Sequence, residues 1–263
     1  ELHLPRPPWI LIYSLAARLK LKVKPTLPTK PVGFSTLERS KSWSKMNIVF
    51  DKVSKNYGLI NVFKNLDLKI KPGDFVFVTG PSGSGKSTLV KLILNQVKPT
   101  SGEIIIDDYH LNSIKDKKVI DRIRKKIGVI FQDFQLINDL TVEENIALAL
   151  DIVGYPSSKI PSRIDEVVKM VKLQHRYFLF PSQLSGGELQ RASLARALAI
   201  EPEVILADEP TGNLDPANAW NLVKILQEIN EKFNTTIVMT THNLDFIESL
   251  DKKVIHLGKD ETL

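Results

Sequence analysis

The sequence predicts an α/β fold in which a core of strands and helices is interrupted by a purely helical insertion. Two observations point to this class. Short apolar runs with strand character alternate with helical patterns over residues 46–131 and again from residue 204 onward. Between these regions, residues 133–200 show only the apolar spacing that is typical of helices. At 263 residues with 43% hydrophobic content, the chain is long enough to bury such a core.

The expected elements follow the chain in this order. Before the insertion we expect strands at Ile48–Val53, Leu66–Ile70, Asp74–Thr79, Gly102–Asp107 and Ile127–Phe131, and helices after Lys86 and over Asp116–Lys125. Within the insertion we expect helices at Val142–Val153, at Ile164–Val171 and after Ser185, separated by turns that contain prolines. After it we expect strands at Val204–Ala207, Thr236–Thr240 and Lys253–Leu257, and a helix at Ala217–Phe233.

A glycine-rich segment follows the apolar run Phe75–Val78. It fits the phosphate-loop pattern G-x-x-x-x-G-K-[ST], and its residues are Gly80, Pro81, Ser82, Gly83, Ser84, Gly85, Lys86, Ser87 and Thr88. Glycines let the backbone N–H groups point at phosphate oxygens, and the helix that follows adds the positive end of its dipole. We expect the whole segment to bind ATP, with Lys86 at the β- and γ-phosphates and the Ser87 hydroxyl on Mg²⁺. An ordinary Gly/Ser turn is the alternative, which the strand, the spacing and the Lys-Ser pair disfavour.

Two later segments indicate how the nucleotide is used. Ser185, Gly186 and Gly187 precede a helical pattern, and the buried-strand run from Val204 ends in Asp208 and Glu209. Taken alone, Ser-Gly-Gly before a helix is an N-cap followed by flexible glycines. In this order, however, the motifs resemble those of the ABC-type ATP-binding cassettes, whose signature loop matches Ser185 to Gly187. The resemblance implies a phosphate-loop NTPase core of that type, with an inserted helical subdomain and a small antiparallel β part.

The resemblance also assigns catalytic and metal-binding roles. It implies that Asp208 holds Mg²⁺ and that Glu209 is the base that activates the attacking water. Gln132, after the strand Ile127–Phe131, matches the glutamine that contacts Mg²⁺ or that water. His242 matches a histidine that senses the γ-phosphate. The alternative for the two carboxylates is that they only cap the next turn, and a lone Gln or His at a strand end is usually a satisfied polar residue.

Two further nucleotide-site residues come from the same resemblance. Asp215 matches the residue of the D-loop that touches the opposing subunit. Tyr57 occupies the place where family members stack an aromatic ring on adenine, although a surface tyrosine in a turn is the alternative. The signature loop is not expected to fold back onto its own phosphate loop, so a second copy must supply it. The resemblance therefore implies a homodimer that sandwiches two ATP molecules.

The distribution of charge separates the first 45 residues from the rest. They hold nine Lys and Arg against two Glu and six of the fifteen prolines, whereas the whole chain carries +6, so residues 46–263 are nearly neutral. We expect residues 1–45 to be a disordered basic extension and residues 46–263 to form the cassette. A basic arm for anionic membranes is the alternative. The apolar run Trp9–Ala17 is too short to span a membrane. The absence of cysteine excludes disulfides, thiolate metal sites and cysteine catalysis.

Within the cassettes the sequence is similar to the FtsE family of cell-division ATP-binding proteins. The phrases that carry this resemblance are Gly73–Gly83, Phe131–Phe134, Val153–Pro156 and Leu206–Pro216. It implies an integral membrane partner of the FtsX type, a peripheral location on the cytoplasmic face of the plasma membrane and no nucleic-acid partner. Lipoprotein-release and macrolide-export ATPases share the phrase from Asp208 to Asp215 and remain alternatives. A soluble cassette acting on ribosomes or DNA is disfavoured, because the core is nearly neutral.

The membrane partner is expected to dock next to Gln132. Phe134 and Leu136 follow that glutamine directly, and apolar residues at such a place are poorly explained unless they pack on something. We expect them to line a groove for a cytoplasmic helix of the partner. Inward packing of both residues onto the helical subdomain is the alternative.

Overall fold

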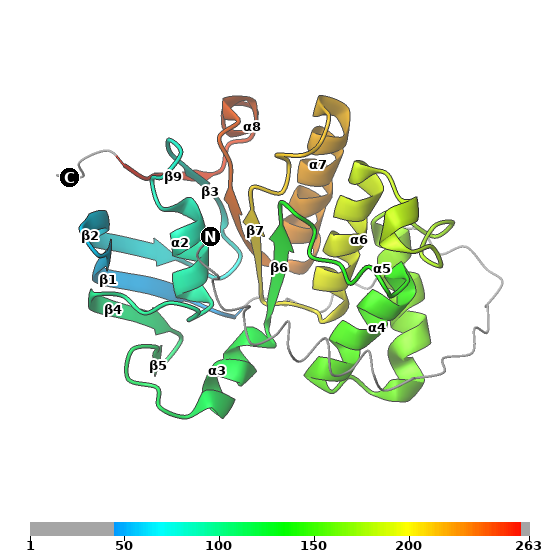
Figure 1. Ribbon diagram of the computed structural model, residues 1–263, viewed down its shortest axis with the longest axis horizontal. Helices are drawn as coiled ribbons and strands as arrows, with labels where there is room; N and C mark the ends of the chain where they lie inside the picture. The colour runs from blue at the N-terminus through cyan, green and yellow to red at the C-terminus, as the bar shows by residue number, and fades with distance from the viewer. Residues whose placement is uncertain (1–44, 259–263) are drawn as a thin grey trace. The chain divides into compact units, whose positions relative to one another are not determined.

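The computed structural model describes residues 45–258, and the predicted basic extension lies outside the described residues except for Lys45. The chain forms two compact units, each of which is described by itself (Figure 1). The α/β unit holds residues 45–134 and 201–258. The helical unit holds residues 135–200, which stand in one stretch between the two parts of the α/β unit.

A parallel sheet forms the centre of the α/β unit. Its strands lie in the order β6-β7-β8-β3-β9, with β6 at Ile127–Phe131, β7 at Val204–Asp208, β8 at Thr236–Thr240, β3 at Phe75–Thr79 and β9 at Lys253–His256. Every residue of β3 and β8 is buried, as expected for central strands of a parallel sheet, which are covered on both faces. The strand positions agree with the sequence prediction to within one residue at either end.

A second, antiparallel sheet confirms the predicted small β part. Its strands lie in the order β2-β1-β4-β5, with β1 at Ile48–Tyr57, β2 at Ile60–Ile70, β4 at Ser101–Ile106 and β5 at Tyr109–His110. The predicted strands Ile48–Val53 and Leu66–Ile70 were too short. They continue as a hairpin that turns at Gly58, where φ is +59°, and shifts of register interrupt the pairing of its strands.

Four helices complete the α/β unit: α2 at Lys86–Ile93, α3 at Lys117–Arg124, α7 at Pro216–Phe233 and α8 at Leu244–Ser249. One continuous hydrophobic core joins both sheets and α2, and Ile48, Leu89 and Val238 are examples of its fully buried members. This core fixes the phosphate-loop helix against the sheet, so the loop before it starts from a rigid support (Figure 1).

The helical unit packs three helices on one another: α4 at Val142–Val153, α5 at Ile160–Met170 and α6 at Gly186–Ala199, with short 3₁₀ turns at Ser157–Lys159 and Pro181–Gln183. Helix α5 begins four residues before its predicted start, because Pro161 lies in its first turn, where a proline costs no hydrogen bond. Among the described residues, no helix has both the length and the apolar character needed to cross a membrane.

Two polar side chains tie the first residues of the helical unit to its helices. Asn145 of α4 is 1% exposed, donates to the carbonyls of Ile137, Leu140 and Thr141, and accepts from the N–H of Ile137. Arg196 of α6 donates to the carbonyl of Gln135. Residues 135–141, at the start of the helical unit, are therefore tied to its helices.

Candidate functional site

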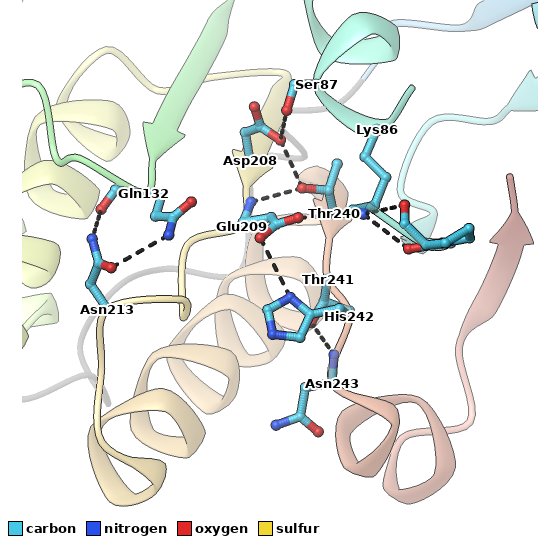
Figure 2. A network of polar contacts seen from close by, with 12 residues as sticks. Lys86, Ser87, Gln132, Asp208, Glu209, Asn213, Thr240, Thr241, His242 and Asn243 are labelled. Atoms are coloured by element: carbon cyan, nitrogen blue, oxygen red, sulfur yellow. Dashed lines mark hydrogen bonds and ion pairs between the residues drawn. The ribbon is translucent and has the colours of Figure 1, made fainter. Parts of the chain in front are cut away.

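The ends of three parallel strands bring the acidic residues of the site together. In the sheet, Asp208 pairs with Phe131 of β6 on one side and with Thr240 of β8 on the other. Gln132, Glu209 and His242 follow just beyond these strand ends, so all three lie at the same edge (Figure 2). This is the carboxyl edge of the sheet, where α/β proteins bind their ligands.

The phosphate-loop segment ends in a helix with an open N-terminus. Gly85, the N-cap of α2, has a φ of +99° and provides no side-chain cap, whereas α3, α4, α6 and α7 all begin with side-chain caps. A Cβ on Gly85 would lie 2.5 Å from the Val62 side chain and 2.7 Å from the Phe63 ring, so both space and backbone require glycine. The free N–H groups of the first turn suit an anion such as a phosphate.

Three ionisable side chains lie in contact with one another between the phosphate loop and the end of β8. Lys86 is 6% exposed, and its Nζ donates to the carbonyls of Gly80 at 2.9 Å and Pro81 at 3.2 Å. The same Nζ lies 3.4 Å from Oε1 of Glu209, while Oε2 of Glu209 lies 3.4 Å from Nδ1 of the exposed His242 (Figure 2). Glu209 thus stands between the two groups predicted to contact the γ-phosphate.

Thr240 contacts both acidic residues, the carboxylate of Asp208 and the backbone of Glu209, and sequence reasoning missed it. Its hydroxyl donates to Oδ1 of Asp208 at 2.8 Å and accepts from the backbone N–H of Glu209 at 2.7 Å. The second bond holds Glu209 at a φ of +45°, a left-handed conformation that costs free energy in a residue other than glycine. The sequence shows only that a threonine ends an apolar strand. That this threonine meets Asp208 follows from β8 lying next to β7, which cannot be read from the sequence.

The donors around Asp208 fit a magnesium ion held together with a phosphate. Ser87 Oγ donates to Oδ1 of Asp208 at 3.2 Å, so a hydroxyl and a carboxylate oxygen stand beside the phosphate loop. Magnesium prefers such oxygen ligands and usually takes one or two from the protein, with water and substrate phosphates as the others. No cluster of three or more His, Cys, Asp or Glu suited to a metal exists within residues 45–258.

Gln132, Asp215 and Tyr57, the other residues predicted in the α/β unit, each have a different local environment. Gln132 pairs with Asn213, at the edge of the same sheet. Asp215 caps the N-terminus of α7, and hydrogen bonds from the side chain and backbone of Asn218 hold its pKa below the usual value. Tyr57 ends β1 with 44% of its surface exposed, and Nζ of Lys55 lies 4.6 Å from its ring centre.

The signature loop belongs to the helical unit. Ser185 is the N-cap of α6: its backbone N–H donates to the Glu188 carboxylate at 2.8 Å, and its hydroxyl accepts from the Glu188 backbone N–H at 3.4 Å, which together form a capping box. Gly186 and Gly187 form the first turn of the helix. The N-cap interpretation and the signature interpretation are compatible, since both use the same helix N-terminus. The assigned roles of all these residues stay predictions.

Comparison with known proteins defines the family. A family model described as ABC transporter matches residues 63–212, and the chain belongs to this family. It is an ATP-hydrolysing subunit of an ABC complex, as the sequence predicted. The cell division ATP-binding protein FtsE of Bacillus subtilis (strain 168) is 48% identical over 196 residues, which are 74% of this chain and 85% of that protein. The methionine import ATP-binding protein MetN of Vibrio vulnificus (strain YJ016) is 39% identical over 83% of this chain, which matches 62% of that protein.

A solved structure agrees with the fold. The ATP-binding cassette MJ0796, solved as a dimer in a post-hydrolysis state with bound ADP and Pi, has a TM-score of 0.72 and 38% identity. The match covers 80% of this chain and 94% of that one. The predicted fold class, an α/β cassette of the ABC type, is confirmed.

Proposed function

We propose that this chain is the ATPase subunit of a membrane-associated complex that acts in cell division, as FtsE. The observation that carries the proposal is the 48% identity with FtsE of Bacillus subtilis over 85% of that protein. MetN is 39% identical, but this chain spans only 62% of its length, so the methionine importer has a further part without a counterpart in the match. The match therefore covers more of FtsE, 85% of its length, than of MetN.

In the proposed reaction the chain binds ATP by its triphosphate. The open N-terminus of α2 and the Lys86 ammonium bind the β- and γ-phosphates, and the negative charge of the phosphates competes with Glu209 for Lys86. Ser87 and Asp208 hold Mg²⁺, which neutralises phosphate charge when it is bound. Gln132 contributes an amide oxygen to the metal or to the attacking water, and Tyr57 stacks on adenine.

Glu209 is the proposed general base. Once Lys86 turns to the phosphates, one carboxylate oxygen of Glu209 accepts a proton from the attacking water, which adds to the γ-phosphorus as ADP leaves. His242, which lies 3.4 Å from the other oxygen, orients that carboxylate and donates a hydrogen bond to the γ-phosphate. The short hydrogen bond from the Glu209 backbone N–H to the Thr240 hydroxyl keeps this residue in place while the water reacts.

The proposed active form is a homodimer. MJ0796 is dimeric and 38% identical to this chain, which supports the same assembly here. In it, the phosphate loop of one copy and Ser185, Gly186 and Gly187 of the other bind the same ATP, and Asp215 faces the opposing copy. Closure then depends on ATP and hydrolysis reopens the dimer.

The proposed membrane partner is an FtsX-like integral protein, which places the chain at the cytoplasmic face of the plasma membrane. Phe134 and Leu136 are the proposed contacts, and both are partly buried. Lipoprotein-release and macrolide-export complexes would use the same catalytic residues with other partners. The identity of the partner therefore decides between these functions.

The test is affinity purification of the chain from membranes of its source, followed by identification of the bound proteins. We expect an FtsX-like membrane protein, and we expect Phe134→Ala to weaken its recovery while ATP binding by the isolated chain is retained. Tyr109→Ala is a matched control, because Tyr109 is an aromatic residue 43% exposed on the edge strand β5. Recovery of a methionine importer or an exporter instead would overturn the cell-division role but not the ATPase.

A further inference from the structure

Gln132 and Asn213 form a reciprocal pair of hydrogen bonds. Nδ2 of Asn213 donates to the backbone carbonyl of Gln132 at 3.0 Å, and Nε2 of Gln132 donates back to Oδ1 of Asn213 at 3.4 Å. Figure 2 shows the two side chains facing each other beside Asp208 and Glu209. Both residues belong to the α/β unit, although they are far apart in the sequence.

The backbone on both sides of this pair is folded into turns. The Phe134 N–H donates to the carbonyl of Phe131 at 3.2 Å, so Gln132 lies inside a tight turn at the end of β6. On the other side, the Gly212 N–H donates to the carbonyl of Glu209 at 3.1 Å and the Leu214 N–H to that of Thr211 at 3.1 Å. Asn213 is thus held at a fixed place between Glu209 and α7.

Gly212 provides the space in which the Gln132 side chain lies. A Cβ on Gly212 would stand 2.8 Å from Nε2 of Gln132 and 3.1 Å from its Cδ, so the glutamine side chain would have to shift to make room for it. Gly212 does not adopt a left-handed φ, so the reason for glycine here is space and not backbone conformation. The glutamine therefore packs directly on the Gly212–Asn213 backbone.

The chemistry of the two amides fixes their orientation. A backbone carbonyl can only accept, so the Asn213 group that meets the Gln132 carbonyl must be Nδ2. The other end of the Asn213 amide is then Oδ1, which also can only accept. The Gln132 group that meets it must be Nε2, which leaves Oε1 as the other end of the Gln132 amide. A single arrangement satisfies both hydrogen bonds.

We propose that Asn213 is a positioning residue that sets which end of the Gln132 amide is offered to the nucleotide. By engaging Nε2, Asn213 keeps the oxygen Oε1 available to Mg²⁺ or to the attacking water. The reversed amide would present two N–H donors, which cannot ligate a cation and cannot accept a proton from water. The inference rests on the proposed role of Gln132 in ATP hydrolysis and deepens it.

The test is a double-variant cycle measured by ATP turnover of the full chain. We expect Asn213→Ala to lower kcat roughly tenfold, the cost of about one lost positioning hydrogen bond. We also expect it to weaken the binding of Mn²⁺, used as a probe for the Mg²⁺ site, to the ATP-bound chain before turnover, as measured by electron paramagnetic resonance. The KM for ATP is expected to stay within about twofold, because the phosphate loop is untouched. With Gln132→Ala already present, Asn213→Ala should have no further effect on kcat.

A second variant and a control keep the test sharp. Asn213→Asp loses the donor to the Gln132 carbonyl but keeps an oxygen that accepts from Nε2 of Gln132, so it should retain more turnover than Asn213→Ala. Asn112→Ala removes a similar donor, which bonds to the Gly102 carbonyl away from the site, and should turn over ATP like the wild type. Two results would overturn the inference and leave the proposed function intact. One is additive effects of the two variants in the cycle, and the other is normal turnover by both Asn213 variants while Gln132→Ala is impaired. Normal turnover by Gln132→Ala would instead remove the proposed role of Gln132, and the inference with it.

Discussion

Glu209 combines a strained backbone with two side-chain partners, the Lys86 ammonium and the His242 imidazole. Its φ of +45° is unfavourable for a residue with a side chain, and the Thr240 hydroxyl holds it there at 2.7 Å. Such strain persists where the surrounding structure enforces it, and it is frequent at functional sites. The carboxylate also meets Lys86 and His242, each at 3.4 Å. A residue that only capped a turn would need neither arrangement.

Variants at Glu209 and Lys86 are expected to fail in different ways. Glu209→Gln keeps the shape of the side chain but removes the base, so ATP should still bind while kcat falls about 10²- to 10⁴-fold. Lys86→Ala removes the cation that meets the phosphates, so it should lose affinity for ATP. The measurements are ATP turnover and equilibrium binding of a fluorescent ATP analogue. Wild-type turnover by Glu209→Gln would contradict the assignment of the base.

At the scale of single elements, the N-terminal side of α4 depends on Asn145. This side chain makes four hydrogen bonds with the segment that precedes α4, and it is 1% exposed. Asn145→Ala removes the hydrogen-bond partner of the partly buried Ile137 N–H and Leu140 carbonyl, so we expect a loss of about 2–4 kcal/mol of unfolding free energy. Urea denaturation followed by circular dichroism measures it. Asn138→Ala, at an exposed position of the same segment, is the matched control, and equal losses in both variants would show that these bonds contribute little.

The capping box of α6 is expected to depend on pH. Hydrogen bonds from the backbone N–H of Ser185, and then from its hydroxyl, hold the pKa of Glu188 below its ordinary value of 4.5. A lowered pKa in the folded state means that the carboxylate stabilises the fold above that ordinary value and loses this contribution as pH falls through the lower, folded value. Glu188→Gln keeps an acceptor without the charge.

The wild type is therefore expected to melt at a higher temperature than Glu188→Gln near neutral pH. The difference should shrink as the pH falls below 4.5, since the wild-type side chain then becomes neutral as well. Thermal unfolding of both proteins across this range measures it. A difference that stays constant with pH would show that the charge of Glu188 does not contribute.

How well an element could be predicted depends on whether its signals are local. Helix α4 was predicted at Val142–Val153 and lies there, because Thr141 and Glu144 form a capping box at its start and Gly154 ends it in a left-handed conformation. The outer halves of β1 and β2 were missed because residues 54–57 are mostly polar and residues 60–65 alternate only over Ile60 to Val62, so pairing with each other orders them. The two-residue strand β5 depends in the same way on β4.

The site shows the same division between local and distant signals. The phosphate loop, the strand that ends in Asp208 and Glu209, and the positions of Gln132 and His242 could be read along the chain. Thr240 and Asn213 could not, because their importance comes from strands and turns that are adjacent only after folding. Their partners lie 32 and 81 residues away along the sequence.

At the scale of the whole molecule, the proposed ATP site needs two copies of the chain. Lys86 lies in the α/β unit, and Ser185 begins α6 in the helical unit. In the proposed homodimer each ATP contacts Lys86 of one copy and Ser185 of the other. A dimer made only of a Lys86 variant, or only of a Ser185 variant, has a defect in both of its sites. In a dimer that contains one copy of each variant, both defects fall in the same site and the other site is intact.

Mixing the two variants is expected to restore activity. Lys86→Ala and Ser185→Arg should each hydrolyse little ATP alone, and the mixed dimer should have one intact site, built from Lys86 of the Ser185→Arg chain and Ser185 of the Lys86→Ala chain. If copies exchange at random, half of the dimers are mixed and each has one of its two sites, so an equal mixture should reach roughly a quarter of the wild-type rate. Thermal unfolding of each variant checks that Ser185→Arg, which alters the N-cap of α6, is folded. A mixture no more active than the mean of its two components would mean that the sites are not shared between copies.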